Sequence, residues 1–94
     1  MITSPSDARL LRIAPQDNVA VAVAALEPGQ QVTFEDQTIT IEDPISMGHK
    51  VALTTIAAGR KVLKYGAPIG SATRDIRPGE HVHTHNLKSD YLPT

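Results

Sequence analysis

Short stretches of alternating apolar and polar residues predict most of the secondary structure of this chain. In residues 32–35 and 37–41, apolar and polar residues alternate on either side of Asp36, as in the two strands of a hairpin. Residues 9–13 predict a first strand that ends before Pro15, and residues 61–66 predict another that runs into a Gly-Ala-Pro turn. The pattern therefore indicates many short strands joined by tight turns, with little or no long helix.

Residues 19–26 fit two kinds of element when they are considered alone. Asp17 could cap a helix whose apolar face includes Val19 and Val23, while the alternating β-branched residues argue equally for a strand. A comparison within the chain decides between them in favour of a strand.

A spacing pattern recurs three times along the chain. Each copy has an alanine, an aliphatic residue four positions later, a glycine three positions after that and a valine three positions further on. The copies are Ala22-Leu26-Gly29-Val32, Ala52-Ile56-Gly59-Val62 and Ala72-Ile76-Gly79-Val82. Because the third copy follows the poor helix former Pro68-Ile69-Gly70-Ser71, we expect all three to begin as strands. Each copy should then turn at its glycine with a positive φ.

Length and composition favour one small β-rich domain. The chain has 94 residues, few aromatic side chains and no tryptophan, and its apolar content comes mainly from Val, Ala, Ile and Leu. We expect the folded domain to span residues 9–88, between a polar N-terminal tail at 1–8 and a polar C-terminal tail at 89–94. The absence of cysteine excludes disulfides and thiolate metal sites.

Charge argues against two large classes of partner. Nine basic and ten acidic residues leave a net charge of -1, and no run of Lys or Arg suggests binding to nucleic acid or to an anionic membrane. No apolar run approaches the roughly 20 residues that span a bilayer, and the first residues lack the pattern of a secretion signal. We expect a soluble cytoplasmic protein.

Three of the four histidines stand at alternate positions near the end of the sequence, at His81, His83 and His85. In an extended strand such side chains point to one face, roughly 6.6 to 7 Å apart, so neighbouring rings could meet on one ligand. The row could serve proton transfer, divalent-metal binding or carboxylate recognition. A histidine-rich strand end could equally be a solvated edge.

Four segments resemble, in the same order, motifs of the N-terminal SAF-type domain of the altronate and galactarate dehydratases. They are Asp17-Asn18-Val19-Ala20-Val21-Ala22, Gly48-His49-Lys50-Val51-Ala52-Leu53, Lys64-Tyr65-Gly66-Ala67-Pro68-Ile69-Gly70 and His83-Thr84-His85-Asn86-Leu87. The resemblance spans about residues 9–88. It implies an all-β domain of the β-clip (SAF-like) fold, shared with antifreeze-like domains of sialic acid synthases and with pilus and flagellar chaperones.

The resemblance also implies a function. Its enzymes are hydro-lyases that remove water from sugar acids with a divalent metal such as Fe²⁺ or Mn²⁺. The long C-terminal region that carries most of the family's active site is absent here. The chain is therefore similar to the small subunit of a split altronate dehydratase or sulfolactate sulfo-lyase, a non-autonomous part of a carbon-oxygen lyase that needs a large dehydratase-type catalytic subunit. A domain cut from a fused enzyme would look similar.

The family motif implies catalytic roles for His83 and His85, which are also the candidate metal ligands, and a substrate-binding role for Asn86. His81 falls where the motif is loose, and it receives no role. Two histidines with Asn86 would form a weak, open metal site, and no Glu-x-x-His spacing completes it. We therefore expect the isolated chain to bind metal poorly and to lack dehydratase activity.

Five further residues are candidate substrate contacts. His49 and Lys50 form a polar pair at the start of a strand, where Lys50 could balance a substrate carboxylate or simply be solvated. Lys64, Tyr65 and Gly66 could line the same pocket, although Tyr65 fits core packing equally well. The alternative function is a non-catalytic β-clip module that binds a carbohydrate or a protein.

Overall fold

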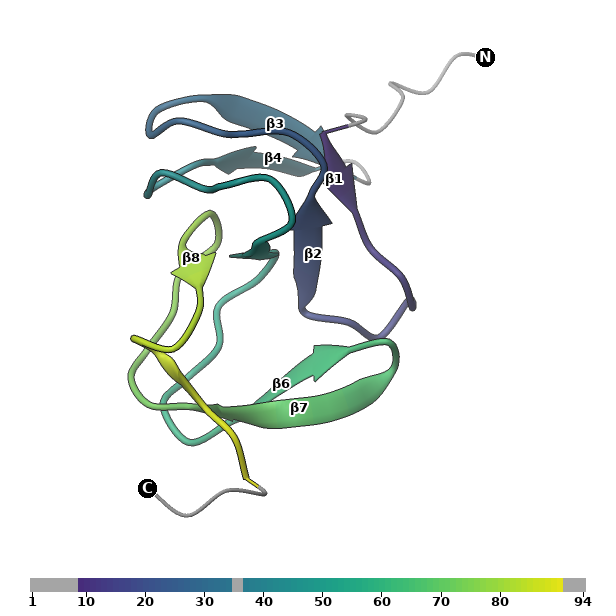
Figure 1. The fold of residues 1–94 in the computed structure, drawn as a ribbon, viewed down its shortest axis with the longest axis vertical. Helices are drawn as coiled ribbons and strands as arrows, with labels where there is room; N and C mark the ends of the chain where they lie inside the picture. Colours follow the sequence, from purple (N-terminus) through teal and green to yellow (C-terminus); the bar gives the residue numbers. More distant parts are fainter. Residues whose placement is uncertain (1–8, 35–36, 91–94) are drawn as a thin grey trace.

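Every regular element in the described part of the chain is a short β-strand (Figure 1). The computed structural model describes residues 9–34 and 37–90, so the predicted N-terminal tail and residues 91–94 lie outside it. The strands are β1 (Leu10–Leu11), β2 (Val19–Ala22), β3 (Gln31–Phe34), β4 (Gln37–Thr40), β5 (Lys50–Ala52), β6 (Lys61–Lys64), β7 (Ala67–Ala72), β8 (His81–Val82) and β9 (Leu87–Lys88). The predicted all-β class is confirmed. None of the described residues belongs to a long apolar helix of the kind that crosses a membrane.

The strands form three small antiparallel sheets. A central sheet has the order β1-β2-β5-β8, β3 pairs with β4, and the third sheet has the order β6-β7-β9. The β3–β4 hairpin lies at one end of the molecule and β6 and β7 lie at the other, with β2 between them (Figure 1). The predicted strand at residues 19–26 is thus confirmed over β2, and the predicted hairpin corresponds to β3 and β4.

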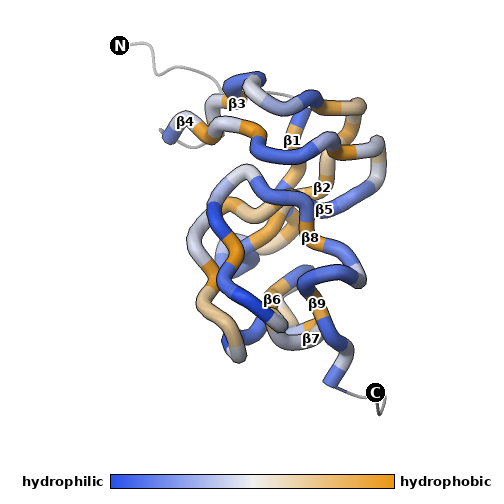
Figure 2. Tube along the Cα trace, turned by 90° about the vertical axis from the view of Figure 1, so that its left-hand side faces the viewer, coloured by the Kyte–Doolittle hydropathy of each residue, from blue (hydrophilic) through white to orange (hydrophobic). Residues whose placement is uncertain are grey.

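The central sheet separates two hydrophobic clusters. Ala20 pairs with Val51, and both belong to the cluster that includes the β3–β4 hairpin. Their neighbours Val19 and Ala52 also pair, but they belong to the second cluster, with residues of β6 and β7. Because successive side chains of a strand point to opposite faces, the small residues of β2 and β5 contribute to both clusters. Figure 2 shows the apolar residues gathered along these central strands.

The three predicted glycine turns are present, and the copies of the spacing pattern contact one another in pairs. Gly29, Gly59 and Gly79 all have φ between 84° and 90°, as expected. The aliphatic residues of copies two and three, Ile56 and Ile76, exchange backbone hydrogen bonds of 2.8 Å. Both side chains are buried, which contributes roughly 1.5 to 3 kcal/mol each.

A fourth copy, missed in the sequence, pairs with the first. It runs Ile41-Ile45-Gly48-Val51, with isoleucine where the other copies have alanine. Leu26 and Ile45 exchange backbone hydrogen bonds as Ile56 and Ile76 do, and Gly48 has a φ of 88°. The domain is therefore assembled from two similar pairs of glycine turns, and the central sheet lies between them.

The second hairpin turns earlier than the sequence suggested. The turn is Tyr65-Gly66, with φ of 58° and 74°, whereas Ala67 and Pro68 already belong to β7. Positive φ at both central positions is typical of a type I′ hairpin turn, and Tyr65 is an unusual residue to adopt it. Proline is tolerated in β7 because the register shifts beside it and β9 pairs only with the far end of the strand.

A buried carboxylate holds this turn. Asp17 accepts hydrogen bonds from the backbone N–H groups of Ala14, Tyr65 and Gly66 at 2.7 to 3.0 Å. Burial alone would raise the pKa of Asp17, but the three N–H donors and the nearby Arg12 lower it below its usual value. Asp17 is therefore ionised at neutral pH and joins the start of the domain to the β6–β7 hairpin.

Candidate functional site

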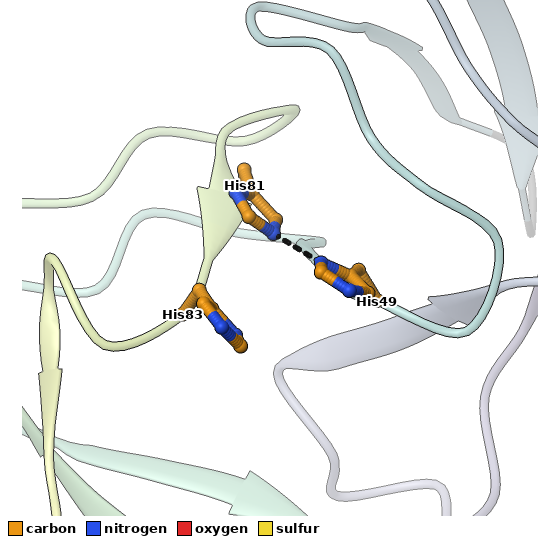
Figure 3. Close-up of side chains that lie close together, drawn as sticks. All are labelled: His49, His81 and His83. Atoms are coloured by element: carbon orange, nitrogen blue, oxygen red, sulfur yellow. Dashed lines mark hydrogen bonds between the residues drawn. The ribbon is translucent and has the colours of Figure 1, made fainter.

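The four histidines gather at the end of the β5–β8 pair. His49 directly precedes β5, His81 belongs to β8, and His83 and His85 follow β8. Figure 3 shows the first three rings facing one another across the gap between these two segments. The ring centroid of His49 lies 5.0 Å from that of His81 and 4.9 Å from that of His83. His85 lies beside His81, at 5.3 Å between centroids.

The predicted extended row of histidines is wrong beyond Val82. Strand β8 ends there, and residues 83–86 form a turn in which the N–H groups of Asn86 and Leu87 donate to the carbonyl of His83. The turn brings the rings of His81 and His83 to 5.4 Å between centroids, closer than an extended strand would hold them.

His81 has the central position in the group, although the sequence suggested no role for it. Its ring contacts the other three histidine rings. His81 Nε2 lies 2.8 Å from His49 Nδ1, so one of these two nitrogens must accept the hydrogen bond and carry no proton. Burial and then the neighbouring histidines lower the pKa of His81, against the opposing effect of Asp43. The environment of His81 therefore favours its neutral form.

Three of the rings are close enough to share a metal ion. One ring nitrogen from each of His49, His81 and His83 lies within 4.8 Å of the others, and His49 and His81 are partly buried. Their planes differ by only 14° to 20°, so the rings are stacked. Because the lone pairs of an imidazole lie in the ring plane, the side chains must rotate before all three can point at one ion.

Asn86 holds the turn that carries the histidines. Its side chain is fully buried, its Oδ1 accepts from the His83 N–H at 2.9 Å, and its Nδ2 donates to the His81 carbonyl at 2.8 Å. The predicted substrate-binding role of Asn86 does not fit this geometry, because its amide is occupied within the chain and is shielded from solvent. Asn86 is a positioning residue for His81 and His83.

Replacing Asn86 with alanine should therefore disturb both the fold and the histidines. The substitution leaves the His83 N–H and the His81 carbonyl, whose hydrogen bonds to Asn86 are partly buried, without these partners. The expected loss of unfolding free energy is about 1 to 3 kcal/mol. Urea denaturation measures the loss, and the imidazole signals in NMR spectra should shift for His81 and His83. Unchanged NMR signals together with unchanged stability would contradict this role. Asn18→Ala is the control, because it measures the unfolding free energy lost when a less buried asparagine is removed.

The predicted lysines lie near one another on neighbouring sheets. Lys50, in β5, has a pKa lowered first by burial and then by the positive charge of Lys64, at the end of β6. Lys64 Nζ also lies 4.6 Å from the centroid of the Tyr65 ring. Two cationic groups held near each other would bind an anion such as a carboxylate.

Tyr65 and Gly66 have a less direct relation to the histidines. The Tyr65 side chain is 63% exposed, so the alternative of core packing is wrong. The N–H groups of both residues are occupied by Asp17, and among the described residues no hydrogen bond or ring contact joins them to the histidines. The structure thus brings His49, His81, His83 and His85 together and leaves the β6–β7 turn as a separate feature.

Comparison with known proteins identifies relatives of two kinds. Residues 8–90 match the family model described as altronate/galactarate dehydratase SAF domain. Over 80 residues the chain is 49% identical to altronate dehydratase of Escherichia coli and 40% identical to that of Bacillus subtilis. Each match covers 85% of this chain. It spans only 16% of the length of these two enzymes.

The second kind of relative is a small subunit. The chain is 41% identical over 75 residues to (2R)-sulfolactate sulfo-lyase subunit alpha of Chromohalobacter salexigens. This match covers 73% of the chain and 80% of the subunit. With a family model that matches nearly the whole described fold, the chain belongs to the SAF domain family of the altronate and galactarate dehydratases.

Proposed function

We propose that this chain is the SAF-type component of a hydro-lyase that dehydrates a sugar acid such as altronate or galactarate. A larger dehydratase component would complete the active site. The observation that carries the proposal is the histidine group at the end of β5 and β8, which lies on an open surface with no cavity formed by the described residues. A group of this kind needs a second surface to enclose a substrate and exclude water.

The relatives support an enzyme that consists of two components. The chain corresponds to 16% of the E. coli altronate dehydratase, which leaves most of such an enzyme to be supplied by other residues. Its coverage of 80% of a protein named as a subunit supports an arrangement in which the small component is a separate chain.

Dehydration of a sugar acid needs two proton transfers. A base removes the proton from the carbon next to the carboxylate, and an acid protonates the hydroxyl that leaves the neighbouring carbon as water. His83 and His85 are exposed, lie within one turn and are suited to these transfers near neutral pH. His49 would contact the substrate beside them, while Lys50 and Lys64 would balance its carboxylate.

A divalent metal in the assembled enzyme would stabilise the negative charge that develops on the carboxylate side of the substrate. In that arrangement His83 and His85 would be its ligands instead of the base and the acid. Imidazole donors suit Fe²⁺, whereas Mn²⁺ prefers carboxylate oxygens, which would have to come from the larger component.

The proposal is tested by replacing His83 and His85 with alanine in the assembled two-component enzyme. We expect turnover of altronate or galactarate to fall by roughly 10² to 10⁴-fold while the components still co-elute. Lys88→Ala, at an exposed position of β9, is the matched control and should retain turnover.

Two outcomes would contradict the proposal. Unchanged turnover in the histidine variants would favour the alternative, a β-clip module that holds a carbohydrate or a protein partner without chemistry. Turnover by the purified chain alone would show that no larger component is required.

A further inference from the structure

Three histidine rings face one another at the end of the β5–β8 pair, and they come from two segments far apart in the sequence (Figure 3). The ligand nitrogens of His49, His81 and His83 all lie within 4.8 Å, and those of His49 and His81 are 2.8 Å apart. Around a divalent cation with metal–nitrogen bonds of about 2.0 to 2.1 Å, three such nitrogens lie about 3 to 3.4 Å apart. The observed separations bracket this range, so rotation of the side chains is enough to reach it.

The backbone beneath these rings is fixed by contacts that do not use the imidazoles. His81 pairs with Val51 across the strands, and its N–H donates to the Asp43 carboxylate at 2.9 Å. The N–H of His83 donates to the side chain of Asn86. The backbone positions are thus set in advance, and only the partly exposed rings need to move, which lowers the entropy cost of binding an ion.

We infer that His49, His81 and His83 form a metal site within this chain, one that takes a divalent cation of the Zn²⁺, Co²⁺ and Ni²⁺ class. All three donors are imidazole nitrogens, which suit these cations and not Mg²⁺ or Ca²⁺, whose preferred ligands are oxygens. Three protein ligands leave a further coordination position open at the surface, the arrangement typical of catalytic and not of structural zinc sites.

The inference goes beyond the proposed function, because it needs neither a larger component nor a substrate. It also revises the expectation that the isolated chain binds metal poorly. That expectation counted His83 and His85 only, whereas the fold places His49 and His81 beside His83.

The test is a titration of the purified, chelator-treated chain with Co²⁺ and Zn²⁺, followed by calorimetry and by the visible absorption of bound Co²⁺. We expect saturable binding of one ion per chain and no comparable binding of Mg²⁺. His49→Ala, His81→Ala and His83→Ala should each weaken binding by at least about tenfold, since even loss of a residue that only supports a ligand has an effect of that size.

Thr84→Ala is the matched control, because Thr84 is an exposed residue of the same turn that offers no ring nitrogen and lies outside the set of three. It should leave Co²⁺ affinity unchanged. Thermal unfolding without metal shows whether each variant is folded, and His81→Gln replaces His81→Ala if the latter is not. Absence of one-to-one binding, comparable binding of Mg²⁺, or an equal loss in the Thr84 variant would overturn the assignment. Because the readout is binding by the chain alone, it is independent of any result on turnover.

Discussion

Replacing Gly79 with alanine should destabilise the domain by about 2 to 5 kcal/mol, a large part of the roughly 5 to 15 kcal/mol that stabilises a small protein. Gly79 is buried and has a φ of 89°, which costs an L-residue roughly 1 to 2 kcal/mol. A Cβ at this position would also clash with the backbone carbonyl oxygen of Thr40. The backbone of β4 would have to move, which adds an overpacking cost of about 1 to 3 kcal/mol. Urea denaturation of the two proteins measures the difference.

Gly59 provides the matched control for this prediction. It occupies the same position in its copy and has a φ of 84°, but a Cβ there would meet no atom within 4 Å. Gly59→Ala should therefore lose only the roughly 1 to 2 kcal/mol that positive φ costs. Equal losses in the two variants would show that the close approach of Gly79 to Thr40 does not contribute.

Asp17→Ala should have the second largest effect, a loss of about 3 kcal/mol at neutral pH. The substitution removes the acceptor of three N–H groups, two of them in the Tyr65-Gly66 turn. Asp75→Ala is the control, because within residues 9–34 and 37–90 the exposed Asp75 accepts a hydrogen bond only from the N–H of Ala58. Its loss should cost no more than about 1 kcal/mol. A loss in the Asp17 variant no larger than in the Asp75 variant would contradict the role of Asp17.

The effect of Asp17 should also depend on pH in a definite direction. Its pKa in the folded protein is lowered from the ordinary value of 3.8, so ionised Asp17 stabilises the fold. This contribution is fully present above about pH 4 and is lost as the pH falls through the lower folded pKa. The difference in unfolding free energy between wild type and Asp17→Ala should therefore be constant from neutral pH to about pH 5 and shrink below pH 4. A difference that grew on acidification would have the wrong sign.

Local requirements made the glycine turns predictable. A positive φ depends on the identity of one residue, which is usually glycine. The repeated spacing around Gly29, Gly59 and Gly79 therefore predicted these turns from the sequence. The copy at Gly48 was missed because Ile41 replaces its alanine, and the Tyr65-Gly66 turn was misplaced because a tyrosine with positive φ leaves no sign in the sequence. The pairing of the copies with one another was likewise not visible.

The candidate site was predictable only where it is local. The sequence pointed to His49, His83 and His85, but it did not show that His49 would lie beside His81. That contact results from the pairing of β5 with β8, whose residues are distant in the chain. Copies two and three pair with each other; copy two begins at Ala52 in β5, and copy three ends at Val82 in β8. Recognition of this pairing would have placed the two strands side by side. The burial of Asn86 was also hidden, because an asparagine in a turn is more often exposed.

The hydrogen-bonded pair of His49 and His81 is also a reporter on the folding process. The two residues are 32 positions apart, so their rings meet only after a long loop has closed. Contacts within the β3–β4 and β6–β7 hairpins close much shorter loops and can form earlier. The titration of His81 would therefore mark the point in refolding at which the two pairs of glycine turns come together.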